Sequence, residues 1–159
     1  MSKYPEMNES QFAWHVFLFN KNRNDFELKG ENELKMLEEE SKEFFLDAKT
    51  TAERLDALVD FEFVFSGTKM KISAQFNPID PMVALMCQEA IESMKMILMG
   101  ELNLHADAFE EIHAKARKFV VQCNELKGSE LDEDGKVMKP ENLPNATVMI
   151  AQMLSDVLG

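Results

Sequence analysis

The chain has 159 residues, and its 29 acidic residues outnumber its 17 Lys and Arg residues, so its formal charge is −12 at pH 7. This charge excludes electrostatically driven binding of a nucleic-acid polymer by the chain as a whole. With 45% hydrophobic and 29% charged residues, the composition is that of a globular protein. The length predicts a single domain over residues 1–159.

No apolar stretch reaches the roughly 18 residues that a membrane-spanning helix needs, and the first residues lack the basic-then-apolar order of a signal peptide. We therefore expect a cytoplasmic protein with no membrane partner. Cys87 and Cys123 lie far apart in the sequence, which predicts neither a disulfide framework nor a zinc site. We expect both to behave as small buried apolar residues.

Glycine and proline are few, with six and five residues, and they lie between long stretches of helix-forming sequence. This pattern predicts an all-α protein. In chain order, we expect helices over residues 10–22, 32–48, 52–72, 81–100, 106–126 and 146–158. Pro81 suits the first position of a helix, and Gly128 suits the left-handed cap that follows one. Residues 129–145 are polar and contain Asp134-Gly135, so they predict an ordered loop before the final helix.

The expected helix over residues 32–48 has an apolar face and an acidic face. Its predicted apolar stripe consists of Leu34, Leu37, Ser41, Phe44, Phe45 and Ala48. At 100° per residue, Glu39, Glu40 and Glu43 fall within an arc of about 100° opposite this stripe. Three carboxylates on one helix face are common where that face meets solvent. The acidic cluster alone therefore does not indicate a site.

The expected helix over residues 52–72, for which the Thr50, Thr51 pair offers an N-cap, is apolar nearly all round from Leu55 to Phe65. Such a helix is buried. Asp56 and Asp60 lie one turn apart on it, so both carboxylates are expected to face the interior or a cleft. Two ionised carboxylates there repel each other and are costly to desolvate. A divalent cation such as Mg²⁺ or Mn²⁺, which prefers oxygen ligands, resolves this cost.

Two alternatives for Asp56 and Asp60 need no metal. The first is ion pairing with a nearby cation, for which the candidates are Arg54, Lys42 and Lys69. The second is that one of the two acids stays protonated. Glu53 lies about 10 Å along the helix from Asp60, so we expect at most an indirect role for it.

The expected helix over residues 81–100 is rich in methionine. Its five relevant methionines are Met82, Met86, Met94, Met96 and Met99. So much apolar surface on one helix predicts burial between subunits. Because methionine-rich surfaces also suit adaptable protein binding, a non-catalytic helical interaction module is an alternative of a different class.

The acidic pattern resembles a known family. Glu39-Glu40-x-x-Glu43, followed after a linker by Asp60 in an apolar helix that continues as 63–68, is similar to the all-α nucleoside triphosphate pyrophosphohydrolases. The resemblance is to the phage and bacterial MazG-like subgroup, which is related to dimeric dUTPases and phosphoribosyl-ATP pyrophosphohydrolases. A second similarity lies in Asn124-x-x-Lys127 and the later segment 135–139, and the likeness spans roughly residues 10–145.

The sequence departs from the family pattern at one position. Ala57 stands where the pattern has an acid three residues before Asp60, and the acid is found one residue earlier, at Asp56. Either spacing keeps the two acids on the same helix face. The number of metal ions in the predicted site is open for this reason.

The resemblance implies a MazG-like bundle of four to six helices that associates as a homodimer or a dimer of dimers. It implies Mg²⁺, which Mn²⁺ can replace, bound by Glu39, Glu40, Glu43, Asp56 and Asp60. The implied reaction is (d)NTP + H₂O → (d)NMP + PPi, and similarity to phage-type relatives points to a deoxynucleotide, with the host cytoplasm as the location if the chain is phage-encoded. Phosphoribosyl-ATP hydrolysis is the alternative activity.

The resemblance also assigns roles to single residues. Glu39 is expected to orient or deprotonate the attacking water. Lys127 and Lys139 are expected to contact the phosphates, and Asn124 is expected to bond to a phosphate or the sugar. The alternative for the lysines is structural, because a lysine at the end of a helix complements the helix dipole and a loop lysine is solvated.

Overall fold

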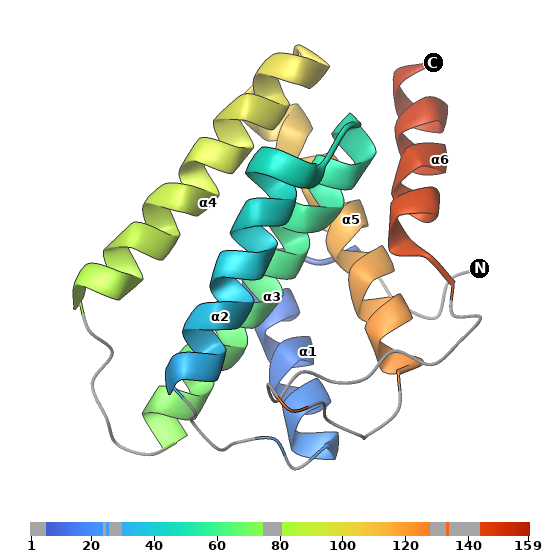
Figure 1. The fold of residues 1–159 in the computed structure, drawn as a ribbon. Helices are drawn as coiled ribbons and strands as arrows, with labels where there is room; N and C mark the ends of the chain where they lie inside the picture. Colours follow the sequence, from blue (N-terminus) through green and yellow to red (C-terminus); the bar gives the residue numbers. More distant parts are fainter. Residues whose placement is uncertain (1–5, 24, 26–29, 75–80, 128–132, 134–143) are drawn as a thin grey trace.

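The computed structural model describes residues 6–23, 25, 30–74, 81–127, 133 and 144–159 (Figure 1). These residues form six α-helices and one π-helical turn, with no β-strand among them. The elements are α1 (Glu9–Asn22), α2 (Gly30–Lys42), η1 (Glu43–Asp47), α3 (Thr51–Ala74), α4 (Pro81–Leu102), α5 (Ala106–Glu125) and α6 (Ala146–Leu158). The predicted all-α class is therefore confirmed.

Helix α3 is the centre of the fold. It packs against α1, α2, η1, α4, α5 and α6, and Figure 1 shows the other helices arranged around it. Its residues Leu55, Ala57, Leu58 and Val59 are completely buried, as the apolar run in the sequence predicts. The residues of α3 that are not apolar are therefore held at fixed positions between the surrounding helices.

The observed helix ends agree closely with the predicted ones, except in the second helix. Helix α2 ends at Lys42 and continues as η1, where the amide of Ala48 donates to the carbonyl of Glu43 at 2.8 Å. Phe44 is buried, whereas Phe45 is 46% exposed, which corrects the predicted stripe at Phe45.

The inward face of α2 also differs from the predicted stripe. The buried residues of this helix are Glu33, Met36, Leu37 and Glu40, which at 100° per residue span an arc of about 100°. Leu34 lies outside that arc and is half exposed, so its predicted place in the core is wrong. The inward face of α2 thus carries two carboxylates that the simple apolar pattern places on the surface.

Side-chain caps explain where several helices begin. The amide of Gln11 donates to Asn8 Oδ1 at the start of α1, and the amide of Thr147 donates to Asn145 Oδ1 at the start of α6, both at 2.9 Å. At α3 the amide of Glu53 donates to Thr50 Oγ1 at 3.1 Å, and Glu53 Oε2 accepts from the amide of Lys49 at 2.6 Å. Glu53 is thus occupied at the helix end.

Some predictions on loops lie outside the described residues. These are the left-handed cap at Gly128 and most of the ordered loop over residues 129–145. Helix α4 runs two residues past its predicted end at Gly100, and the residue after it, Asn103, takes the left-handed conformation with φ of 54°. Asn tolerates that conformation better than most residues with a side chain.

Helix α4 has one face against α3 and one face toward solvent. Met94 is buried and Met99 is partly buried, whereas Met82, Met86 and Met96 are between 61% and 67% exposed.

Within the described residues, no helix is both long and apolar enough to cross a membrane.

A charged network lies buried between α3 and α5. His113 Nε2 bonds to Glu62, and the guanidinium of Arg117 lies 3.3 Å from Glu62 Oε2 and 2.8 Å from Glu110 Oε1. Burial alone would lower the pKa of His113, but the charge of Glu62 and the bonds to Glu110 and Glu62 raise the pKa above its usual value. The hydrogen bond with His113 lowers the pKa of Glu110 most. Partial burial acts in the opposite direction, and Arg117 lowers the pKa further, so that it falls to about 2. The network is therefore a set of compensated charges in the core.

These pKa shifts predict how stability depends on pH. The contribution of His113 is full below about pH 6.5, its unfolded pKa, and is lost as the pH rises through its higher folded pKa. Melting temperatures measured by calorimetry between pH 6 and pH 9 should fall more for the wild type than for His113→Gln. Parallel curves for the two proteins would show that His113 does not carry this dependence.

Candidate functional site

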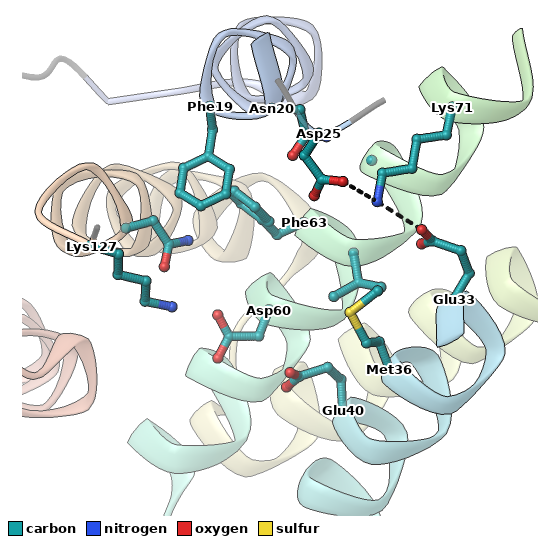
Figure 2. Close-up of a pocket in the computed structure, with 13 residues that line it drawn as sticks. Phe19, Asn20, Asp25, Glu33, Met36, Glu40, Asp60, Phe63, Lys71 and Lys127 are labelled. Carbon is teal, nitrogen blue, oxygen red and sulfur yellow. Dashed lines mark hydrogen bonds and ion pairs between the residues drawn. The ribbon is translucent and has the colours of Figure 1, made fainter. Parts of the chain in front are cut away.

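Four acidic residues gather around the middle of α3. Glu40 comes from α2, Glu43 from η1, and Asp56 and Asp60 from α3 itself. Burial raises the pKa of Asp60 well above its usual value, and the charges of Asp56, Glu40 and Glu43 raise it further. Figure 2 shows the carboxyl groups of Asp60 and Glu40 at the same end of a pocket. An ionised Asp60 is therefore destabilised by its surroundings in the absence of a cation.

Two of the cations considered as partners for these acids make other contacts, and the third, Lys42, is exposed at the end of α2. Arg54 Nε lies 2.6 Å from Glu101 Oε1, and Arg54 also donates to the carbonyl of Ala48. Lys69 Nζ lies 4.5 Å from the centre of the Phe65 ring. The raised pKa of Asp60 instead favours the other alternative for the metal-free protein, in which one acid keeps its proton.

The start of α6 lies beside the acidic cluster. Asp56 Oδ2 accepts a hydrogen bond from Thr147 Oγ1 at 2.5 Å, in the first turn of that helix. A smaller cavity there is lined by Asp56, Asp60, Lys127 and the residues 144–146 that begin α6. The positive end of the α6 dipole thus faces the acids.

Lys127 and Asn124 reach the same place from the end of α5. Both line the two cavities that Asp60 also lines, and the charge of Lys127 acts to lower the pKa of Asp60. Asn124 is 6% exposed. The structure therefore brings the predicted pair Asn124 and Lys127 to the predicted acids Asp56 and Asp60.

Arg23, which sequence reasoning missed, holds the end of α5 in place. Its Nη2 donates to the carbonyls of Lys127 at 2.8 Å and Asn124 at 3.3 Å, and its Nη1 donates to the carbonyl of Phe19 at 3.2 Å. The guanidinium carbon also lies 3.7 Å from the centre of the Phe19 ring. The only sequence signal for this role is a basic residue just past the end of a predicted helix.

The larger pocket lies among α1, α2, α3 and the end of α5. It is the larger of the two cavities that Asp60 lines, and it is partly open to solvent, with a cavity volume of about 80 Å³. Figure 2 shows Asp60, Glu40 and Lys127 at one end, Phe19 and Phe63 in the middle, and the ion pairs of Lys71 with Asp25 and Glu33 at the other end. The pocket thus joins an acidic end to an apolar middle and a second polar end.

One predicted site residue lies apart from this arrangement, and another falls outside the described residues. The side chain of Glu39 is exposed and lines neither of the two cavities described here. Lys139 lies outside the described residues. Glu43 is exposed but close enough to act on the pKa of Asp60.

The donor set suits a hard divalent cation. Carboxylate oxygens are the ligands that Mg²⁺ prefers, and a cation beside Asp60 would compensate the charges of Asp56, Glu40 and Glu43. Among the residues that the structure describes, no group of three or more His, Cys, Asp and Glu side chains is arranged to hold a metal ion. Metal binding at this cluster is therefore a proposal and not an observed property.

Comparisons of the chain with protein-family models, with curated proteins and with solved structures find no match. The support for a function therefore comes from the chain's own residues.

The position of Arg23 predicts a measurable loss of stability in Arg23→Ala. Removing the guanidinium leaves three carbonyls at two helix ends without this donor, which costs about 1–3 kcal/mol of the free energy of unfolding. Urea unfolding followed by circular dichroism measures the change. The control is Lys21→Ala, at an exposed position in the last turn of α1, which should change the free energy by less than about 0.5 kcal/mol. Equal effects of the two substitutions would contradict the role assigned to Arg23.

Proposed function

We propose that this chain is a Mg²⁺-dependent nucleoside triphosphate pyrophosphohydrolase with a MazG-like fold, which converts a (d)NTP and water to a (d)NMP and pyrophosphate. The observation that carries the proposal is the crowding of the partly buried Asp60 with Asp56 and Glu40, at the end of a pocket that also receives Lys127. Carboxylates crowded in this way are costly unless they bind cations. A cation-loaded acidic end next to a lysine is what a triphosphate requires.

In this proposal the chain's own residues divide the work by position. Glu40, Glu43, Asp56 and Asp60 would hold Mg²⁺, which supplies charge neutralisation at the phosphates and a water of lowered pKa. Lys127 offers the positive charge at the acidic end, where it binds phosphate oxygens. Asn124, buried beside it, offers amide hydrogen bonds that orient the phosphate or sugar.

The water-orienting role of Glu39 stays a prediction within this proposal. Its side chain points to solvent, whereas that of its neighbour Glu40 is buried in the pocket wall. Replacing Glu39 or Glu40 by Gln shows which of them orients the water, because replacing that residue lowers kcat.

A deoxynucleotide substrate, association as a homodimer or a dimer of dimers and a cytoplasmic location belong to the same proposal. The support for association is the exposed apolar face of α4, where Met82, Leu85 and Met86 are about half or more exposed. Patches of this kind often mark contact surfaces.

The same exposed methionines favour a second candidate, a non-catalytic helical interaction module. In that case the acids around Asp60 would serve no metal. The two candidates differ in whether the acidic cluster responds to divalent cations, which a thermal measurement detects directly.

The crowding of carboxylates predicts that Asp60→Asn changes the melting temperature differently with and without metal. Without metal, removal of the buried like charge should raise the melting temperature by a few degrees, at about 2–4 °C per kcal/mol for a chain of this size. With saturating Mg²⁺ or Mn²⁺, only the wild type should gain further stability. Differential scanning calorimetry in EDTA and in metal measures both effects. An unchanged melting temperature of the wild type in metal would favour the interaction module.

The proposed reaction predicts the products from a panel of ribo- and deoxynucleoside triphosphates with Mg²⁺ or Mn²⁺. Pyrophosphate and nucleoside monophosphate should appear together, and Asp60→Asn should lower kcat/KM at least about 100-fold with an unchanged circular dichroism spectrum. The matched control is Glu38→Gln, an exposed acid of α2 outside both cavities, which should keep full activity. Release of orthophosphate alone would contradict cleavage between the α and β phosphates.

A further inference from the structure

The end of the larger pocket that is remote from Asp60 is itself built of polar side chains. Asp60, Gly67 and Lys71 all line the pocket from α3, and their spacing places them on one helix face with about 16 Å between the first and the last along the axis. Figure 2 shows Asp60 and Lys71 at opposite ends of the pocket. A nucleotide with its phosphates at Asp60 would extend its base toward Lys71.

The carboxylates at this remote end differ in how fully they are engaged. Glu33 accepts from Lys71 Nζ at 2.7 Å through one oxygen and from Thr68 Oγ1 at 2.6 Å through the other. Asp25 Oδ1 lies farther from Lys71 Nζ, at 3.4 Å. Among the contacts of the described residues, Asp25 is therefore the acid of this pair with more hydrogen-bond acceptor capacity toward the pocket.

Asn20 presents a buried amide to the same space. It is 5% exposed and lines the pocket, and within the described residues its side chain makes no hydrogen bond. Figure 2 shows the Asn20 side chain directed into the pocket beside Asp25. The pocket is partly open to solvent, so water can bond to this amide, and a ligand that enters the pocket can take the place of that water.

Gly67 leaves the room that the Asn20 amide occupies. A Cβ atom at position 67 would lie 3.2 Å from Asn20 Nδ2, which is closer than a relaxed contact. The absence of a side chain at Gly67 thus keeps the amide at its place in the pocket.

An apolar zone separates this polar end from the acidic end. It is formed by Phe19, Met36, Phe63 and Val64, and the rings of Phe19 and Phe63 meet edge to face with their centres 5.0 Å apart. Arg23 covers one face of the Phe19 ring, whereas Phe63 is partly exposed and can stack on a nucleobase.

We infer that the pocket end formed by Asn20, Asp25 and Gly67 is a nucleobase subsite that selects bases with an amino group beside an unprotonated ring nitrogen, as in cytosine and adenine. The Asn20 amide can donate to the ring nitrogen and accept from the amino group, and Asp25 can accept the second amino hydrogen. Uracil and thymine present a carbonyl oxygen to Asp25 instead, so two acceptors would face each other. This inference takes the nucleotide ligand from the proposed function and adds its base class.

The test is equilibrium binding of monophosphates, which lack the α–β anhydride bond, to the protein in saturating Mg²⁺, measured by calorimetry. Deoxycytidine and deoxyuridine 5′-monophosphates differ at the base edge alone and are the matched pair of probes. We expect the wild type to bind the cytidine probe about tenfold or more tightly than the uridine probe. In Asp25→Asn the ratio should fall toward one, because the new amide offers a donor to the carbonyl oxygen.

Two further variants separate recognition from folding. Gly67→Ala should weaken both probes several-fold, although alanine favours the helix more than glycine does, so the loss of binding is not a loss of structure. Glu38→Gln, on the exposed side of α2, should leave both affinities unchanged.

Equal affinity of the wild type for the two probes, no measurable binding of either, or an equal change of both in Asp25→Asn would overturn the inference. Pyrophosphate release from all triphosphates without preference would overturn it and leave the hydrolase proposal standing. Base-selective binding without hydrolysis of any triphosphate would support the subsite and overturn the hydrolase proposal.

Discussion

The crowding of one partly buried carboxyl group, that of Asp60, with neighbouring acids is the constraint around which the candidate site is arranged. Asp60 lies on α3, the helix against which the other helices pack, so its backbone cannot move away from these acids without disturbing the core. Its pKa is raised by burial and by the acids Asp56 and Glu40, which means that the fold keeps an unfavourable charge cluster at its centre. Structures keep such local costs mostly where a function depends on them.

The helices could be predicted from the sequence because their signals are local. The apolar run around Leu58, the proline at Pro81 and the cap at Asn145 each determine a boundary or a buried face through neighbouring residues alone. The π-helical turn after Lys42 was not predictable in this way, because no local residue pattern around Lys42 marks it. The exposure of Leu34 follows from how α2 lies on α3, which is a property of the packed molecule.

The predictable part of the candidate site is the part that helix periodicity controls. Asp56 and Asp60 share a face because they are four residues apart on α3. Lys127 lies just past the end of α5, where its amide donates to the carbonyl of Asn124. Asn20, Arg23 and the pair of Glu33 with Lys71 were missed, because their meeting depends on how α1 sits against α2 and α5. Glu39 and Glu40 are neighbours in the sequence and differ by about 100° around the axis of α2. The first is exposed and the second is buried, and this difference depends on how α2 is rotated in the packed molecule.

The contacts of Arg23 have an electrostatic consequence for anything negative that enters the pocket. Helices α1 and α5 both finish beside this guanidinium, and a helix terminates in carbonyl oxygens that carry partial negative charge. Two such endings next to Lys127 would repel an approaching anion. Arg23 bonds to the carbonyls of Phe19, Asn124 and Lys127 and so reduces that repulsion. The ammonium group of Lys127 then attracts the anion more strongly.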